Sequence, residues 1–178
     1  MSPTSETNAI RIALHPVRPE DEEFLFEVYA STRAPELAAT GWSEEQRQSF
    51  LRAQFQAQDK HYRENYPAAE LNVIHVESGR AGRLYVHRRT KEIRIMDLAL
   101  LPAFRGRGVG TTLLKQVLAE GQRLGTSVTV HVEMFNPALR WYERLGFRKV
   151  GVNGPYCLME QSANSGTQPA PAAQKLVA

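Results

Sequence analysis

The chain has 178 residues, of which 42% are hydrophobic and 23% are charged, and its formal net charge is +3. This length and composition are typical of one soluble globular domain with a sizeable core. No long Lys/Arg run marks a nucleic-acid-binding arm, and no segment approaches the roughly 20 apolar residues that cross a membrane, so neither nucleic acid nor membrane is an expected partner.

The N-terminal part of the chain begins without order and then becomes regular. Residues 1–8 are polar and are expected to be loose, and they lack the basic and apolar regions of a secretion signal. Residues 9–17 alternate apolar and polar side chains, which predicts a first strand. Pro19 and the acidic residues that follow it predict a helix start. The apolar face of this helix is formed by Phe24, Leu25, Val28 and Tyr29.

A second, longer helix is predicted up to about Asn65. Ser43 and Gln46 have the spacing of a capping box, in which each side chain satisfies a main-chain N–H group of the other residue. The apolar positions of the helix are Phe50, Leu51 and Phe55, and a second line consists of Arg47, Gln54, Gln58 and Tyr62. This second line is either a solvated flank of the helix or part of a pocket wall.

Three strands follow, over residues 71–76, 82–87 and 92–101. The third is nearly all apolar, as expected of a strand that is covered on both faces, and Asp97 is its exception. An unpaired carboxylate is costly at such a position. Asp97 therefore either takes part in chemistry or pairs with a buried arginine, for which Arg94 and Arg33 are the candidates.

The turn after this strand carries glycine at three alternate positions, Gly106, Gly108 and Gly110. A helix is predicted from about Val109 to Leu124, where Gly125 ends it. The free N–H groups and the positive dipole end of this helix point into the turn, so the turn predicts a cradle for a phosphate or pyrophosphate. The sequence lacks the Gly-Lys-Ser/Thr ending of a P-loop and the glycine spacing of a dinucleotide fold. A turn with no ligand is the alternative.

The C-terminal part of the chain contains a further strand, a short helix and a final hairpin or strand. Residues 127–135 form the strand, whose polar face carries Thr129, His131 and Glu133. Pro137 opens the helix and Gly146 ends it, and residues 147–160 form one or two last strands. Residues 162–178 are rich in Ser, Ala, Gln and Pro and are expected to be a disordered tail.

Cys157 is the only cysteine, which excludes an intrachain disulfide and a metal site built from several cysteines. No metal site is predicted. A reducing, cytoplasmic location fits this cysteine usage and the absence of a secretion signal.

Two stretches of the sequence resemble the signatures of the GNAT acetyltransferase superfamily. The first is Arg105-x-x-Gly108-x-Gly110, between an apolar strand and an amphipathic helix, which resembles the family's acetyl-CoA-binding motif. The second runs from Asn136 through Ala138 and Tyr142 to Gly146 and Phe147. The resemblance is strong over residues 71–159 and weak before them.

The resemblance implies an α/β fold of the GNAT type over residues 9–161, as a single domain. In this fold a mixed central sheet of six to seven strands has helices on both faces. The fourth and fifth strands, here residues 92–101 and 127–135, splay apart in a V. Acetyl-CoA, the acetyl donor, would enter the V, with its pyrophosphate over residues 106–111.

The activity implied by the resemblance is transfer of an acetyl group from acetyl-CoA, as cosubstrate, to a primary amine by direct attack. The acceptor would be a small-molecule amine or a peptide N-terminus, and the resemblance leaves a homodimer open. The alternatives are a non-catalytic acyl-CoA-binding module of the same fold and a regulatory domain for another nucleotide.

The resemblance also assigns roles to residues. Tyr142 would protonate the leaving thiolate, although it could instead be a core aromatic. Asp97 is the leading candidate for the general base, followed by Glu133 and His131, and His131 could instead be a packed core residue. Asn136 would contact the donor, cap the helix at Pro137, or do both. The donor-binding residues are Leu98, Ala99, Leu100, Arg105, Gly106, Arg107, Gly108, Val109, Gly110, Thr111 and Asn136. Cys157 has no nucleophile role.

Overall fold

A computed structural model describes residues 10–163. The expected loose segment 1–8 and all but the first two residues of the expected tail 162–178 lie outside the described residues. The described strands form one sheet in the order β1-β2-β3-β4-β5-β7-β6, in which only β4 and β5 are parallel neighbours. The strands are β1 Ile12–Pro16, β2 Glu70–Val76, β3 Gly79–Arg88, β4 Glu92–Leu100, β5 Ser127–Glu133, β6 Arg148–Asn153 and β7 Tyr156–Gln161.

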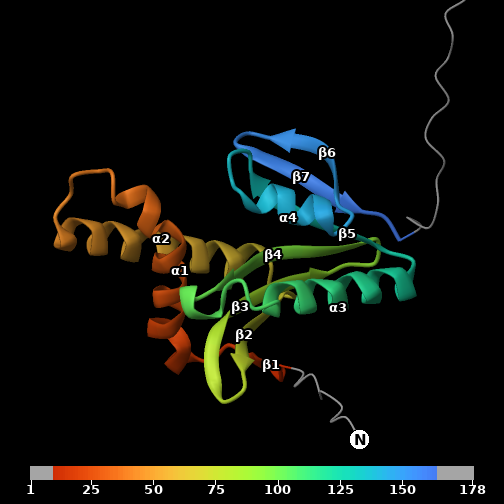
Figure 1. Cartoon of the computed structure of the whole chain (residues 1–178), viewed down its shortest axis with the longest axis horizontal. Helices are drawn as coiled ribbons and strands as arrows, with labels where there is room; N and C mark the ends of the chain where they lie inside the picture. The colour runs from red at the N-terminus through yellow and green to blue at the C-terminus, as the bar shows by residue number, and fades with distance from the viewer. Residues whose placement is uncertain (1–9, 164–178) are drawn as a thin grey trace, which may run out of the picture.

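Helices cover the sheet on both faces (Figure 1). The helices are α1 Glu22–Leu37, α2 Glu44–Asn65, α3 Val109–Leu124 and α4 Ala138–Arg144, with short 3₁₀ turns at Pro19–Asp21 and Pro102–Phe104. Within residues 10–163, no helix combines the length and the apolar character needed to traverse a bilayer. The mixed sheet with helices on both faces confirms the predicted fold class.

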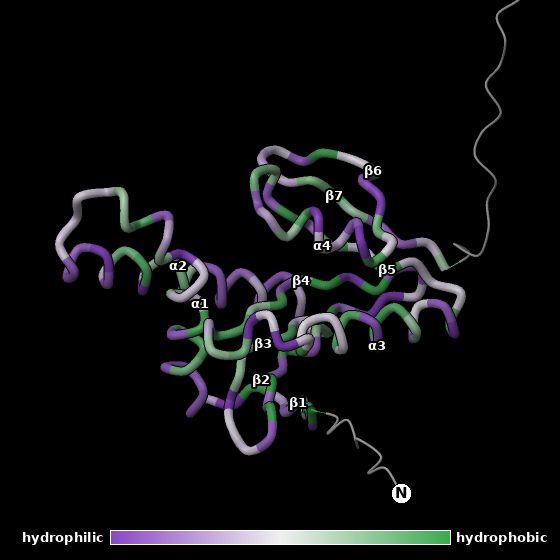
Figure 2. Tube along the Cα trace, viewed as in Figure 1, coloured by the Kyte–Doolittle hydropathy of each residue, from purple (hydrophilic) through white to green (hydrophobic). Residues whose placement is uncertain are grey.

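Two separate apolar clusters hold these layers together. One joins α3 and α4 to the sheet through residues such as Leu114, Ile95 and Met159, and the other joins α1 and α2 to the opposite face through Leu25, Phe55 and Val73. Hydrophobic and hydrophilic residues alternate along α3 (Figure 2), as expected of a helix that buries one stripe. The sheet therefore lies between two helical layers.

Several local features predicted from the sequence are present in the structure. The Ser43 side chain accepts a hydrogen bond from the Gln46 N–H at 3.2 Å, and the Gln46 side chain accepts one from the Ser43 N–H at 2.9 Å, which confirms the capping box. Gly125 ends α3 with φ +64°, a left-handed conformation that favours glycine. The C-terminal region forms two strands, β6 and β7.

Other boundaries differ from the sequence prediction. The strand expected over residues 127–135 ends at Glu133, because the Met134 N–H turns to the Pro155 carbonyl and Phe135 is 95% exposed. Phe50, predicted to be on the buried face of α2, is 41% exposed and packs against Trp42 instead. β3 begins at Gly79, three residues early, since Gly79 pairs with Val76 across a tight turn.

The parallel pair β4–β5 opens part of the way along its length. Paired residues run from Glu92 opposite Ser127 to Ile95 opposite Val130, and the pairing stops there. Residues 96–100 continue β4 without a strand partner on the β5 side. This is the V-shaped splay predicted between the fourth and fifth strands, and it leaves main-chain groups of β4 facing an opening.

Candidate active site

The glycine turn lies at the N-terminus of α3, where β4 ends. Gly106 and Gly108 have φ of +71° and +82°, a region that side chains disfavour. A Cβ atom at either residue would meet nothing within 4 Å. Glycine is therefore required at these two positions by the backbone conformation, and the space in front of the turn is open.

The main-chain N–H groups of this turn are available to a ligand. Among the described residues, the amides of residues 106–111 donate to no backbone carbonyl, whereas the next amide, of Thr112, donates to the Gly108 carbonyl. The positive end of the α3 dipole adds to their attraction for an anion. The turn thus fits a pyrophosphate group.

The two arginines of the turn do different things. Arg105 donates from Nε to the Leu100 carbonyl at 2.7 Å and from a terminal nitrogen to the Ser31 hydroxyl at 2.9 Å, so it ties the turn to β4 and α1. Arg107 is exposed, with its guanidinium 5.7 Å from the Phe104 ring centre, and adds positive charge beside the turn. Arg105 therefore holds the turn against β4 and α1 by hydrogen bonds, a role that its position in the motif did not predict.

A cavity of about 670 Å³ extends from the turn along β4. Its lining includes ten of the eleven residues predicted to bind the donor; only Arg107 is absent from it. Trp141, which the sequence had not singled out, also lines it and donates from its indole nitrogen to the Thr111 hydroxyl at 3.2 Å. The Asn136 side chain accepts a hydrogen bond from the Ala138 N–H at 2.9 Å, so it does stabilise the start of α4.

A second cavity of about 650 Å³ adjoins the first. The two share Thr32, Leu98, Ala99, Asn136 and Ala138 in their linings, so they meet at the splay between β4 and β5. The second cavity, called here the acceptor cavity, is lined by residues of α1, α2, α4 and the strands β3, β4, β5, β6 and β7. It brings together Asp97, Glu133, His131 and Tyr142, the four residues with candidate chemical roles.

Asp97 pairs with an arginine that the sequence reading had not considered. Arg83 of β3 is 2% exposed and donates to the Asp97 carboxylate at 2.6 Å and to the Gln58 side chain at 2.9 Å. The suggested partners Arg94 and Arg33 are wrong, because Arg94 pairs with Glu92 and Arg33 with other carboxylates. The available signal was Arg83, a charged residue between apolar neighbours on the strand that precedes the strand of Asp97.

Glu133 and His131 lie on the polar face of β5. Arg33 of α1 reaches Glu133 at 3.3 Å and Glu36 at 3.2 Å, which ties α1 to the end of β5. Burial, together with the positive charge of Arg94, lowers the pKa of His131 below its ordinary value. The His131 imidazole is therefore neutral at neutral pH and lines the cavity rather than the core.

Tyr142 is 6% exposed and packs between Trp141 and Phe147, with ring centres 4.8 and 5.3 Å away. Burial raises the pKa of its hydroxyl, and the negative charge of Asp97 raises it further, so Tyr142 is protonated at neutral pH. It is a core aromatic that also lines the acceptor cavity. Its position is compatible with a proton donor.

Only part of the second line of α2, which consists of Arg47, Gln54, Gln58 and Tyr62, faces the acceptor cavity. Gln58 and Tyr62 wall the acceptor cavity, and the Tyr62 hydroxyl lies 3.5 Å from the Met96 carbonyl, whereas Arg47 and Gln54 do not line it. The sequence reading missed Tyr29, Glu36, His61, Tyr66 and Tyr156, which also line the cavity. No sequence pattern marked these residues as part of a cavity.

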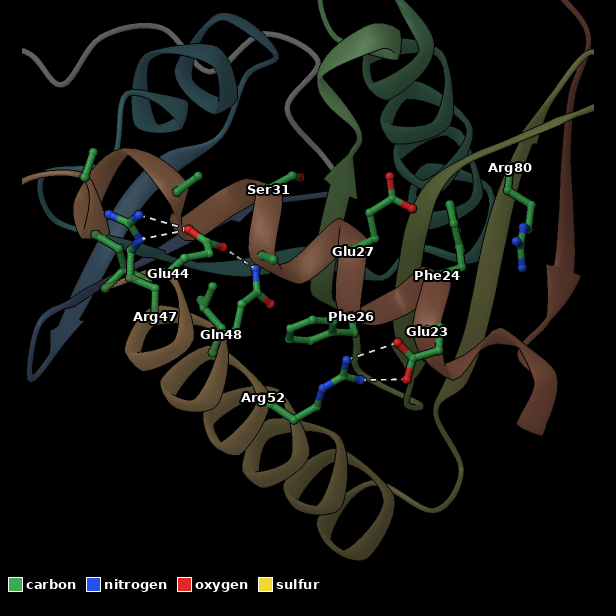
Figure 3. A pocket seen from close by; sticks show the side chains of 15 residues that line it. Glu23, Phe24, Phe26, Glu27, Ser31, Glu44, Arg47, Gln48, Arg52 and Arg80 are labelled. Atoms are coloured by element: carbon green, nitrogen blue, oxygen red, sulfur yellow. Dashed lines mark hydrogen bonds and ion pairs between the residues drawn. The ribbon is translucent and has the colours of Figure 1, made fainter. Parts of the chain in front are cut away.

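A larger cavity of about 870 Å³ lies elsewhere, between α1 and α2 (Figure 3). Its rim carries the ion pairs Arg52–Glu23 at 2.7 Å and Arg47–Glu44 at 2.9 Å, and Phe26 lies beneath Arg52. None of the predicted site residues lines it. Volume alone therefore does not identify the functional site.

Comparisons with known proteins agree with this geometry. The sequence model of the acetyltransferase (GNAT) family matches residues 25–147. PaiA N-acetyltransferase from Thermoplasma acidophilum, solved with coenzyme A, is 20% identical with a TM-score of 0.65, over 85% of this chain and 99% of that chain. The ribosomal-protein-S18-alanine N-acetyltransferase from Escherichia coli is 14% identical with a TM-score of 0.58, over 91% and 98%.

An acetyltransferase from Thermus thermophilus is 22% identical with a TM-score of 0.60, over 84% of this chain and 94% of that chain. At these identities the structural likeness establishes the fold alone. No curated protein matches the sequence significantly.

Proposed function

Because the chain belongs to the GNAT acetyltransferase family, whose members use acetyl-CoA as cosubstrate, we propose that it transfers the acetyl group to a primary amine. The observation that supports this most is the meeting of two cavities at the β4–β5 splay. One is lined by free main-chain amides, and the other by Tyr142, Asp97 and Glu133. Donor and acceptor would enter from these two sides.

On the donor side, the amides of residues 106–111 would hold the pyrophosphate, and the unpaired edge of Leu98, Ala99 and Leu100 would hold the arm by main-chain hydrogen bonds. A main-chain N–H near Leu98 would polarise the thioester carbonyl. The Thr111 hydroxyl accepts a bond from Trp141, which leaves its own proton free for a phosphate oxygen. Acetyl-CoA itself supplies the activated thioester.

On the acceptor side, the amine must lose a proton to attack. The new bond joins the amine nitrogen to the acetyl carbon, and the carbon–sulfur bond breaks. Asp97, or else Glu133 or His131, would take the amine proton directly or through water, and Tyr142 would protonate the departing sulfur. Arg83 holds one oxygen of Asp97, so Asp97 is fixed in position while it faces the cavity.

We also propose that the protein acts in the cytoplasm on a small-molecule amine or a peptide N-terminus. The free, buried Cys157 fits a reducing compartment. A non-catalytic acyl-CoA-binding module is the alternative, and it would keep the glycine turn without needing Tyr142.

The experiment is to incubate the protein with acetyl-CoA and a panel of amines and to follow free thiol. We expect release with at least one amine, and a fall of about 100-fold or more in turnover for Tyr142→Phe, because a positioned general acid contributes about 10²–10⁴-fold. Tyr85→Phe, a buried tyrosine outside both cavities, is the matched control and should retain turnover. Coenzyme A binding without turnover on any amine would favour the binding module.

A further inference from the structure

The arginines that line the acceptor cavity are all occupied. In the part of the chain between residues 10 and 163, each guanidinium of the lining is paired with carboxylates of the chain itself. The pairs are Arg83 with Asp97 at 2.6 Å, Arg94 with Glu92 at 3.0 Å, and Arg33 with Glu36 at 3.2 Å and Glu133 at 3.3 Å. The lining itself contributes three of these carboxylates, Glu36, Asp97 and Glu133, against three arginines, and two of the three carboxylates share Arg33.

Two of the lining carboxylates, Asp97 and Glu133, keep unused hydrogen-bonding capacity. Arg83 engages only Oδ2 of Asp97, and Arg33 engages only Oε1 of Glu133; no described residue donates to the second oxygen of either. The Asp97 and Glu133 side chains are 16% and 37% exposed, so both are reachable from the cavity. The Nε of Arg83 has no partner either, but it is buried beyond contact with a ligand.

Two histidines, His61 and His131, also line the cavity. His131 is neutral at neutral pH because burial and Arg94 lower its pKa. Five tyrosines line the cavity: Tyr29, Tyr62, Tyr66, Tyr142 and Tyr156. Aromatic ring faces attract cations.

We propose that the acceptor is a cationic organic amine that carries no carboxylate or other acidic group near the amine, and that the cavity rejects free amino acids. This rests on the proposed function and narrows its acceptor class. A substrate carboxylate would lose its hydration beside three carboxylates and would meet only guanidiniums that are already paired with a carboxylate, which is unfavourable. A substrate ammonium would instead find the open oxygens of Asp97 and Glu133.

Three compounds of matched shape test this proposal: tyramine, tyrosine amide and tyrosine. Tyrosine amide and tyrosine differ only in the carboxyl group, which is neutral in the first and anionic in the second. Their binding is measured by calorimetry at pH 7 with coenzyme A present, so that no turnover occurs. We expect tyramine and tyrosine amide to bind at least 10-fold more tightly than tyrosine. Equal binding of the last two, tighter binding of tyrosine, or binding of none would overturn the proposal.

A variant tests whether the pairing of Arg33 causes the selectivity. Glu36→Gln removes one of the two carboxylates on Arg33 and should reduce the preference for tyrosine amide over tyrosine at least 3-fold. Glu45→Gln, at an exposed position of α2 that lines no cavity described here, is the matched control and should leave the preference unchanged. An unchanged preference in Glu36→Gln would contradict the role of the Arg33 pairs.

Thiol release separates this proposal from the proposed function. If tyrosine amide binds more tightly than tyrosine but no amine releases thiol, the charge selection stands and the transfer reaction is rejected. If amines and free amino acids both release thiol at similar rates, the transfer reaction stands and the charge selection is rejected.

Discussion

The cavity along β4, called here the donor groove, and the acceptor cavity meet at the β4–β5 splay. The first is formed mainly by main-chain groups and the second by side chains. The groove depends on main-chain amides of six consecutive residues, 106–111, whose conformation is set by local glycines. The cavity depends on side chains such as Arg33, Arg83 and Glu133, which are far apart in the sequence and meet only across the sheet. A ligand site made by the backbone is therefore a local property, while a site made by side chains is a property of the packed fold.

The largest effect is expected at the buried Arg83–Asp97 ion pair of the acceptor cavity. Arg83→Met leaves Asp97 without its counter-charge, and we expect a loss of about 3–5 kcal/mol in the free energy of unfolding, measured with urea. Arg80→Met on the same strand removes a 47% exposed ion-pair partner and should cost about 1 kcal/mol or less. The double variant Arg83→Met with Asp97→Leu should recover much of the loss. Similar losses for the two single variants would mean that the pair does not organise the cavity.

The donor groove should lose affinity for coenzyme A when a charged side chain is placed in the glycine turn. Gly108→Glu places a side chain at φ +82° and a negative charge beside the anion cradle, so coenzyme A should bind about 100-fold or more weakly by calorimetry. Gly125→Glu, at φ +64° on the other end of α3, carries the same strain and charge away from the cradle. It should leave the affinity within about 3-fold; equal weakening by both variants would contradict a local cradle.

The two regions should respond differently to alkaline pH. The main-chain amides of the donor groove do not titrate, whereas the buried phenols around the acceptor cavity do. Burial raises the pKa of Tyr85, whose ring packs against Tyr62 of the acceptor cavity, to about 12. The folded protein then holds this proton more tightly than the unfolded chain, so stability is unaffected below about pH 10 and falls as the pH rises toward 12. Tyr85→Phe should reduce this fall, seen in urea unfolding at pH 8 and 11. At pH 7 it should cost about 1 kcal/mol or less, since the hydroxyl has no partner among the described residues. An unaltered alkaline fall in the variant would be the contrary result.

The smallest expected effect is at the contact between the groove and α4. Thr111→Val removes the hydroxyl that accepts from Trp141 and that is proposed to donate to a phosphate, so coenzyme A should bind about 3- to 10-fold more weakly. Trp141→Phe removes only the indole donor and should have a smaller effect. A larger effect for Trp141→Phe would show that Trp141 packing, and not the hydroxyl, controls the donor groove.

The sequence by itself determined the helices and strands, the capping box at Ser43, the end of α3 at Gly125 and the glycine turn. These features depend on residues that are close in the chain, so periodicity and glycine positions were sufficient signals. The two signatures led to the fold, and the family match supports the fold and the donor. The end of β5 at Glu133 could not be read in this way, because the Pro155 carbonyl that diverts Met134 comes from a distant hairpin.

Only the tertiary structure decided how the acceptor cavity is charged. Asp97 was conspicuous in the sequence, yet its partner Arg83 lies on a neighbouring strand, and the register and bulge between β3 and β4 bring the two together. Arg33 meets Glu133 across 100 positions of sequence. The pairing of charges depends on distances of a few ångströms between separate elements, and such distances exist only after the sheet and its two helical layers have packed.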